Sequence, residues 1–308
     1  MSAAPRLSAA RPLTRSRRRL GEAAIRAALA GCALVSVITT VGIVIALLVP
    51  ALEFFREVSP IDFLFGTNWA PLFSPAHFGV VPLVVGTLLV TVFACVVALP
   101  LGLGVAIYLA EYSSRRLRAV IKPLLEILAG IPTVVYGYFA LTTVTPLLRD
   151  LGLGVEVFNG LSAGLVMGIM LLPTVASLSE DAMTAVPLAL RQGGYALGGN
   201  RLQVSLRIVV PAALSGIVAS FVLAISRAVG ETMIVTIAAG LQPTLTLDPR
   251  VAVETLTAFI ASTAGGDVPT GSIEYKTIFA VGLALFVATL ILNALAIRLV
   301  RRYREVYE

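Results

Sequence analysis

Long apolar runs with almost no charged side chains constrain the fold of this chain more than any other feature. Six such runs occur, near residues 27–50, 80–109, 124–147, 158–178, 212–240 and 277–297, and only the third and the fifth contain any charged residue. About 20 apolar residues in a helix cross a hydrocarbon core of about 30 Å, and a helix satisfies its own backbone polar groups there. Hydrophobic residues make up 58% of the chain and charged residues only 13%, outside the usual balance of a soluble domain. We therefore expect an all-α polytopic membrane protein with six transmembrane helices.

Basic residues divide unevenly between the segments that join these runs. Eighteen of the 23 Lys and Arg fall in the N-terminal tail, residues 111–123, residues 180–211 and the C-terminal tail. Cytoplasmic loops keep such an excess, so both termini are predicted to be cytoplasmic. The arginines of the first tail suit contact with anionic membrane lipid, and the net charge of +6 follows from the same asymmetry. No aromatic-interleaved basic patch accompanies it, so we expect no nucleic-acid partner.

The domain organisation follows from these boundaries. We expect a cytoplasmic Arg-rich tail over residues 1–26, one six-helix domain over 27–297 and a short cytoplasmic tail over 298–308. Within the domain, residues 180–211 form a cytoplasmic loop and residues 241–276 an outer loop.

Residues for enzyme chemistry are scarce. His77 is the only histidine, so neither a His-based metal cluster nor a triad can form within one chain. The two lysines do not follow the Gly-rich pattern of a phosphate-binding loop, so no nucleotide or cofactor site is expected. Glu180 and Asp181 are adjacent carboxylates at the end of the fourth run, where we expect them to be solvated. No pattern of residues favours an enzyme.

The stretch SRAVGETM places Arg227 and Glu231 inside a run that has no other charge between residues 212 and 240. In a continuous helix the two side chains lie one turn apart on the same face, and we expect them to neutralise each other. A charge at this depth costs at least about 2.5 to 3.5 kcal/mol and faces a bundle interior or a watery cavity. Two interpretations stay open, a substrate pathway and a structural ion pair. Thr133, at the start of the third run, is a candidate hydroxyl donor along such a pathway.

The predicted cytoplasmic loop has a more specific pattern. Its sequence RQGGYALGGNRLQVSLRIVVP begins at Arg191 and resembles the cytoplasmic loop of ABC-importer permeases, in which EAA is followed by three residues, a glycine, nine residues and I-x-L-P. The resemblance implies a short coupling helix that docks on an ATPase subunit. Glutamine and two glycines replace EAA, and each glycine costs up to about 1 kcal/mol of helix propensity. The coupling residues are Gln192, Gly193, Gly194, Gly198, Arg201, Ile208 and Pro211.

A wider resemblance covers the chain from about Phe78 to the end of the sixth run. The segments PLGLGVAIYLAEY, KPLLEILAGIPTVVYGYFAL, SRAVGETM and GSIEYKTIFAVGLALF, in this order, are similar to the permease of the phosphate-specific ABC importer, the PstC family. The resemblance implies a type I ABC-importer permease in the bacterial plasma membrane. It also implies a homologous second permease, two ATPase subunits that use ATP, and an extracytoplasmic phosphate-binding protein.

These observations predict a permease that moves inorganic phosphate into the cytoplasm with energy from a separate ATPase. Two alternatives differ from this prediction in kind. One is a permease of the same architecture for another oxyanion. The other is a proton-coupled secondary transporter that works without an ATPase.

Overall fold

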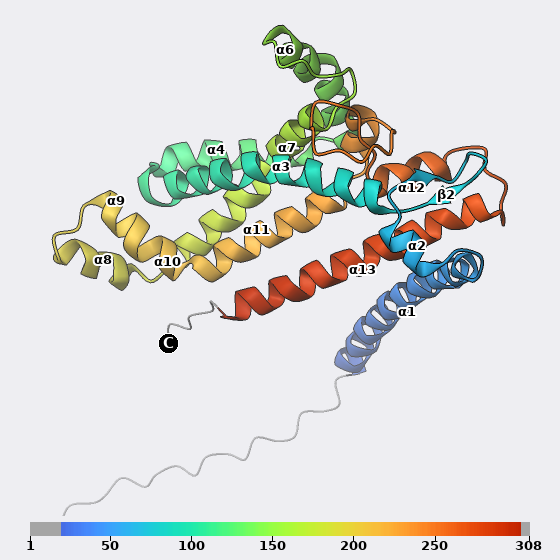
Figure 1. The fold of residues 1–308 in the computed structure, drawn as a ribbon. Coiled ribbons are helices and arrows are strands. Elements are labelled where there is room, and N and C mark those ends of the chain that lie inside the picture. Colours follow the sequence, from blue (N-terminus) through green and yellow to red (C-terminus); the bar gives the residue numbers. More distant parts are fainter. Residues whose placement is uncertain (1–19, 303–308) are drawn as a thin grey trace, which may run out of the picture. The chain divides into compact units, whose positions relative to one another are not determined.

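The computed structural model describes residues 20–302, with side chains described for residues 22–298. The chain divides into two compact units, Met1–Leu47 and Leu48–Glu308. The first unit contributes the beginning of a long apolar helix, and the second contains the other elements, coloured along the chain in Figure 1. The elements, in which η marks a π-helical turn, are α1 (Leu20–Glu57), α2 (Pro60–Phe65), β1 (Trp69–Ala70), β2 (His77–Phe78), α3 (Val81–Ile107), η1 (Tyr108–Tyr112), α4 (Arg115–Gly130), α5 (Thr133–Phe139), η2 (Ala140–Val144), α6 (Thr145–Asp150), α7 (Gly160–Thr184), α8 (Leu188–Ala196), α9 (Arg201–Val204), η3 (Ser205–Val209), α10 (Val210–Ala212), α11 (Leu214–Val229), η4 (Val235–Ala239), α12 (Leu256–Ala264) and α13 (Ile273–Arg302).

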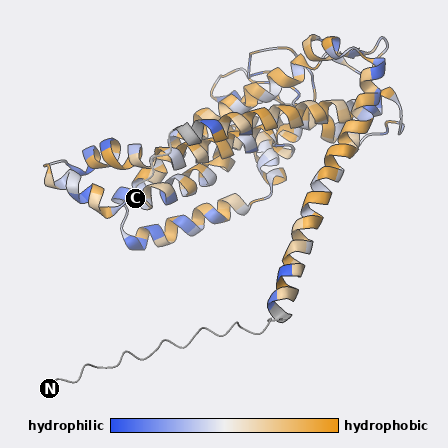
Figure 2. Cartoon of the chain, turned by 90° about the horizontal axis from the view of Figure 1, so that it is seen from below, coloured by the Kyte–Doolittle hydropathy of each residue, from blue (hydrophilic) through white to orange (hydrophobic). Residues whose placement is uncertain are grey.

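The helical content and the number of spans agree with the expected fold class. Within residues 20–302, four helices are long and apolar enough to cross a membrane, and there are six candidate spans if each of two bent helix pairs counts as one. Apolar residues run along these long helices in Figure 2. The orientation of the termini and the domain boundaries stay predictions.

Two of the six expected runs are not straight helices. The run near 124–147 bends by 87° where α4 ends at Gly130 and α5 begins at Thr133. Pro132 lies at this break and has no backbone N–H to donate to a continuing helix. Pro100 and Pro173, in contrast, lie inside α3 and α7 without ending either helix. The second bend, of 71°, separates Arg201–Ala212 from Leu214–Val229.

Close packing of α7 against α3 organises the buried core. Glycines recur every four residues on α7 from residue 160 to 168. A Cβ on Gly164 would lie 2.7 Å from Phe93 Cβ, and one on Gly168 would lie 2.7 Å from Val97 Cβ. Small residues at this spacing let two helix backbones approach closely in a bilayer. The glycines of α7 therefore set how near α3 lies.

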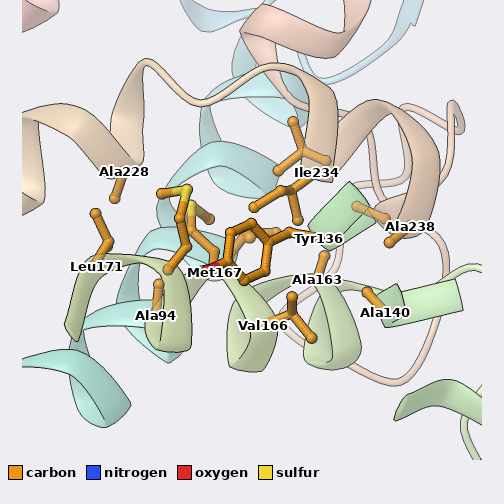
Figure 3. Close-up of a cluster of buried hydrophobic side chains, with 14 of the residues drawn as sticks. Ala94, Tyr136, Ala140, Ala163, Val166, Met167, Leu171, Ala228, Ile234 and Ala238 are labelled. Atoms are coloured by element: carbon orange, nitrogen blue, oxygen red, sulfur yellow. The ribbon is translucent and has the colours of Figure 1, made fainter. Parts of the chain in front are cut away.

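The same core joins both broken spans. Tyr136 of α5, Met167 of α7 and Ala228 of α11 belong to one buried cluster with Ile234 and Ala238, as Figure 3 shows. A Cβ on Gly137 would lie 3.1 Å from the carbonyl oxygen of Met233, so α5 packs closely on the helical segment that follows α11. The second halves of the two broken spans are thus in direct contact.

A separate aromatic cluster lies on the loop that follows α2. The strands β1 and β2 form an antiparallel pair in which Trp69 is opposite Phe78. The Trp69 ring meets the ring of Phe259 from α12 at 4.8 Å, and Phe54 and Phe63 complete the contact. These rings hold the first loop against α12 and α13.

Glu254 lies in the extended segment before α12, and only 5% of its surface is exposed. Burial raises the pKa of its carboxyl from the usual 4.5 to about 7. The folded state therefore keeps a proton that the unfolded state loses, so stability falls as the pH rises from about 4.5 to 7. We expect Glu254→Gln to be more stable than the parent chain at pH 8, by about 3 kcal/mol, and nearly equal at pH 4. Thermal unfolding in detergent at the two pH values measures this, and equal unfolding temperatures at pH 8 would contradict it.

Candidate functional site

The expected helix over residues 212–240 is broken where its charges lie. The helix α11 ends at Val229, residues 230–232 are not helical, and helical structure resumes before η4. Gly230 N–H donates to Ser226 O at 3.3 Å and closes the first helix. The prediction that Arg227 and Glu231 lie one turn apart on a continuous helix is therefore wrong. The glycine ends the helix between them.

Glu231 caps the segment after the break. Its Oε1 accepts hydrogen bonds from Met233 N at 3.0 Å and Ile234 N at 3.3 Å, and the residue is 8% exposed. Its backbone oxygen accepts a bond of 2.6 Å from Thr257 Oγ1 at the start of α12. A carboxylate that accepts backbone N–H groups at the start of a helical segment is stabilised by those bonds. Glu231 thus satisfies the first N–H groups of the segment and needs no cation beside it.

We expect Glu231→Ala to lower the stability of the chain by about 1 kcal/mol, because the N–H groups of Met233 and Ile234 lose their acceptor. Glu231→Gln keeps an acceptor oxygen at the same position and is expected to unfold close to the parent temperature. Thermal unfolding of the purified variants in detergent compares them. If Gln destabilises as much as Ala, the negative charge and not the cap is what the fold requires.

Arg227 stands on the other side of the break, in the last turn of α11. Its side chain is exposed, and its one hydrogen bond in the described residues joins Nη1 to Thr174 Oγ1 of α7 at 3.4 Å. No carboxylate of residues 22–298 forms an ion pair with it, so the expected mutual neutralisation with Glu231 is wrong. The C-terminal end of a helix favours a cation, which offsets part of the cost of placing Arg227 here. The guanidinium keeps most of its five N–H donors for another partner.

Thr133 begins α5 directly after the first break and is half-buried. One turn later, Gly137 packs on Met233 and Ile234, beyond the second break. The structure therefore brings the two broken segments together, although Thr133 and Arg227 do not contact each other through any hydrogen bond in residues 22–298. The role of Thr133 stays a prediction.

The predicted cytoplasmic loop contains two short helices. Residue Gly198, with φ of +83°, closes α8, and Asn200 begins α9 with a capping box to Gln203. Gly194 is buried, and a Cβ there would lie 2.4 Å from Ile208 Cδ1 and 3.1 Å from Val204 Cγ2. The glycine that costs helix propensity in this loop therefore lets α8 pack on the helix that returns.

The other predicted coupling residues divide between the surface and the core of this loop. Gln192, Gly193 and Pro211 are exposed, and Leu197 at the turn is 90% exposed. The guanidinium carbon of Arg201 lies 5.8 Å from the centre of the Tyr112 ring in η1. The loop thus presents an exposed edge while its inner face holds to the membrane domain.

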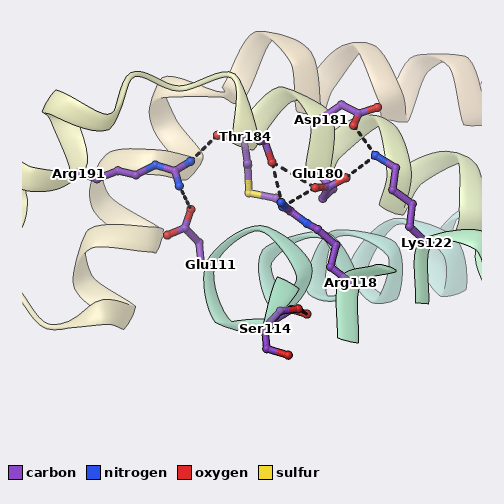
Figure 4. A network of polar contacts seen from close by, with 10 residues as sticks. Glu111, Ser114, Arg118, Lys122, Glu180, Asp181, Thr184 and Arg191 are labelled. Carbon is purple, nitrogen blue, oxygen red and sulfur yellow. Dashed lines mark hydrogen bonds and ion pairs between the residues drawn. The ribbon is translucent and has the colours of Figure 1, made fainter. Parts of the chain in front are cut away.

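Glu180 corrects an expectation. It is 3% exposed in the structure and not solvated, and it pairs with Arg118 and with Lys122 Nζ at 2.9 Å, both on α4. Asp181 also accepts from Lys122, at 2.7 Å. The side chains converge between α4 and the end of α7 (Figure 4). The partners of Glu180 lie about 60 positions earlier in the chain, so no local sequence pattern indicates this pairing.

Arg191 of α8 forms a further ion pair in the same region. Its Nη1 lies 3.1 Å from Glu111 Oε1 of η1, and its Nη2 donates to Met183 O at 2.6 Å (Figure 4). The only sign of this pair in the sequence is that Glu111 is an acidic residue directly after the second apolar run.

Comparison with known proteins assigns the family. Residues 98–305 match the family described as Binding-protein-dependent transport system inner membrane component. The chain is 36% identical over 295 residues to the Probable ABC transporter permease protein YqgH of Bacillus subtilis, with 95% of each chain covered. It is 32% identical over 316 residues to the Phosphate transport system permease protein PstC of Mesorhizobium japonicum, covering 96% of this chain and 94% of the relative.

A solved structure has the same fold. A chain of a bacterial alginate ABC transporter aligns with a TM-score of 0.64 and 16% identity, over 93% of this chain and 98% of that one. At this identity the likeness concerns the fold alone.

Proposed function

The chain belongs to the family of binding-protein-dependent transport system inner membrane components, and from this premise we propose that it passes inorganic phosphate into the cytoplasm. It is a multi-pass protein of the bacterial plasma membrane and a transport subunit, and ATP is hydrolysed on a separate subunit of such importers. In this proposal, an external binding protein delivers the phosphate to this chain. The proposal puts both termini on the cytoplasmic side, because cytoplasmic loops keep an excess of Lys and Arg and most of the basic residues lie in the tails and in the segments 111–123 and 180–211.

The unpaired guanidinium of Arg227 is the observation that carries the choice of an anion. Arg227 lies in an apolar segment, is exposed on this subunit, and has no carboxylate partner within residues 22–298. An arginine in that position is too costly to face lipid and requires a watery cavity or a partner. We place it on a pathway shared with a homologous second permease, where its planar fork of donors matches phosphate oxygens.

Phosphate is preferred over other oxyanions because the chain is 32% identical to a permease named for phosphate transport over 94% of that protein. In this proposal the break in the helix keeps Arg227 apart from Glu231. Glu231 caps one segment and Arg227 lies in the last turn of the other, so the guanidinium lies near the break without being neutralised. A single arginine, with the hydroxyl of Thr133 as a proposed further donor on the pathway, binds phosphate weakly in this proposal, which suits passage, whereas tight binding belongs to the external protein.

The loop of α8 and α9 is the proposed contact with an ATPase dimer. Its exposed edge contains Gln192 and Gly193, and Leu197 at 90% exposure supplies an apolar residue that a partner would cover. Gly194, Gly198 and Ile208 give the loop its shape, and Pro211 begins the return toward α11. The ATP-driven closure of the dimer moves this loop and opens the permease outward. Hydrolysis lets it return.

Uptake of labelled phosphate into proteoliposomes tests the proposal. The chain is reconstituted with its native second permease and ATPase subunits, the binding protein and ATP are supplied, and each component is omitted in turn. We expect uptake that requires ATP, the ATPase and the binding protein together. Uptake by this chain alone, driven by a proton gradient, would establish the secondary transporter instead.

A further inference from the structure

We propose that Arg191 and Glu111 form the positioning joint through which movement of the α8 loop reaches the membrane helix α3. The inference rests on the proposed docking of this loop on an ATPase. In this inference Arg191 and Glu111 contact neither phosphate nor ATP, and their function is to couple ATP hydrolysis to transport.

The geometry of Arg191 connects three elements at one point. From α8 its Nη1 reaches Glu111 Oε1 at 3.1 Å, and its Nη2 donates to the carbonyl of Met183 at 2.6 Å. Figure 4 shows the Arg191 side chain extended from its helix toward Glu111. Met183 lies in the last turn of α7, and Glu111 lies in η1, which continues α3. A displacement of α8 therefore acts on the ends of both α7 and α3.

Burial makes this pair a constraint. The Glu111 side chain is 4% exposed and that of Arg191 is 17% exposed. A buried carboxylate that loses its partner keeps an uncompensated charge, so the two side chains are held together through any movement that does not flood the site. Surface ion pairs lack this property, because water replaces either partner at little cost.

A second contact reaches the same turn from the other helix of the loop. Arg201 of α9 lies over the ring of Tyr112, the neighbour of Glu111, at 5.8 Å. Both helices of the loop therefore hold adjacent residues of one π-helical turn. A π-helical turn has wider hydrogen bonding than an α-helix and is often found where a helix changes shape in function. The joint thus acts on a turn directly after α3, of a kind that is often found where a helix changes shape.

The helix α4 braces the end of α7. Arg118 and Lys122 pair with the buried Glu180, one turn before the end of α7. The end of α7 is therefore fixed to α4 while its carbonyl at Met183 is held by α8. Movement of the loop is passed to α3 and α4 together, and not lost as bending of the loop.

The test measures phosphate transported per ATP hydrolysed by the complete importer in proteoliposomes with its binding protein. We expect Arg191→Gln and Glu111→Gln to lower this ratio about tenfold, within the range of coupling energies between sites, while ATP hydrolysis continues. Lys276→Gln is the matched control, because Lys276 is also 17% exposed and pairs with Glu53 and Glu57, away from the loop. Its ratio should not change.

Further variants keep the outcome decisive. Arg191→Lys retains a charge for Glu111 but lacks the second arm, and an intermediate ratio is expected even if Arg191→Gln does not assemble. An unchanged ratio in an assembled Arg191 variant overturns the joint. A cross-link from Leu197→Cys to the ATPase subunit tests the docking separately. Its absence contradicts the docking and the joint, whereas a cross-link with an unchanged ratio contradicts the joint alone.

Discussion

Arg227→Gln is expected to reduce ATP-driven phosphate uptake by about 100-fold or more, because charge-assisted hydrogen bonds to the passing anion are each worth about 1.5 to 3 kcal/mol. The variant should assemble with its partner subunits normally. Arg227 forms no ion pair with a carboxylate of the described residues and makes one long hydrogen bond, to Thr174. Loss of its side chain therefore leaves no buried charge unpaired.

Two further variants sharpen this result. Arg227→Lys keeps the charge but not the planar fork, and we expect intermediate uptake. Arg250→Gln is the control, since Arg250 is an exposed arginine of the outer segment and is already paired with Asp248 at 2.7 Å. Full uptake by Arg227→Gln would refute its place on the pathway. Loss of assembly would show that it is a structural residue.

Gly86→Ala is expected to destabilise the chain by about 3 kcal/mol or more and to abolish its recovery from the membrane. A Cβ on Gly86 would lie 2.2 Å from the backbone oxygen of Glu254, and a backbone cannot turn aside as a flexible side chain can. The contact joins α3 to the segment that leads into α12.

Gly104→Ala in the same helix is the matched control, because nothing lies within 4 Å of the Cβ it would add. There alanine should be neutral or stabilise by up to about 1 kcal/mol through helix propensity. Yield and thermal unfolding in detergent compare the two variants. Similar behaviour of both would show that the approach of α3 to Glu254 is looser than in the structure.

The apolar runs could be placed from sequence because lipid demands length and lack of charge, two properties that each segment carries by itself. The bend near Gly130 also has a local signal, since Pro132 cannot continue a helix. The break at Gly230 does not, because single glycines are common in membrane helices. Without a sign of this break, the sequence predicts a continuous helix in which Arg227 and Glu231 form a pair.

The polar contacts depend on tertiary packing that no local pattern reveals. Glu180 and Lys122 are 58 positions apart and meet only because α4 lies along α7. The pairing of Arg191 with Glu111 likewise requires the loop to fold back on η1. Gly194 was recognised as a departure from a family pattern, but the reason for it, its contact with Ile208, belongs to the folded loop.

Competition between anions tests whether this permease transports phosphate. Uptake of labelled phosphate by the complete importer is measured in proteoliposomes with an excess of unlabelled phosphate, sulfate or molybdate. If the permease is selective for phosphate, unlabelled phosphate suppresses the uptake of label, and sulfate and molybdate leave it unchanged. Labelled sulfate or molybdate entering faster than phosphate, with the same requirement for ATP, would contradict it.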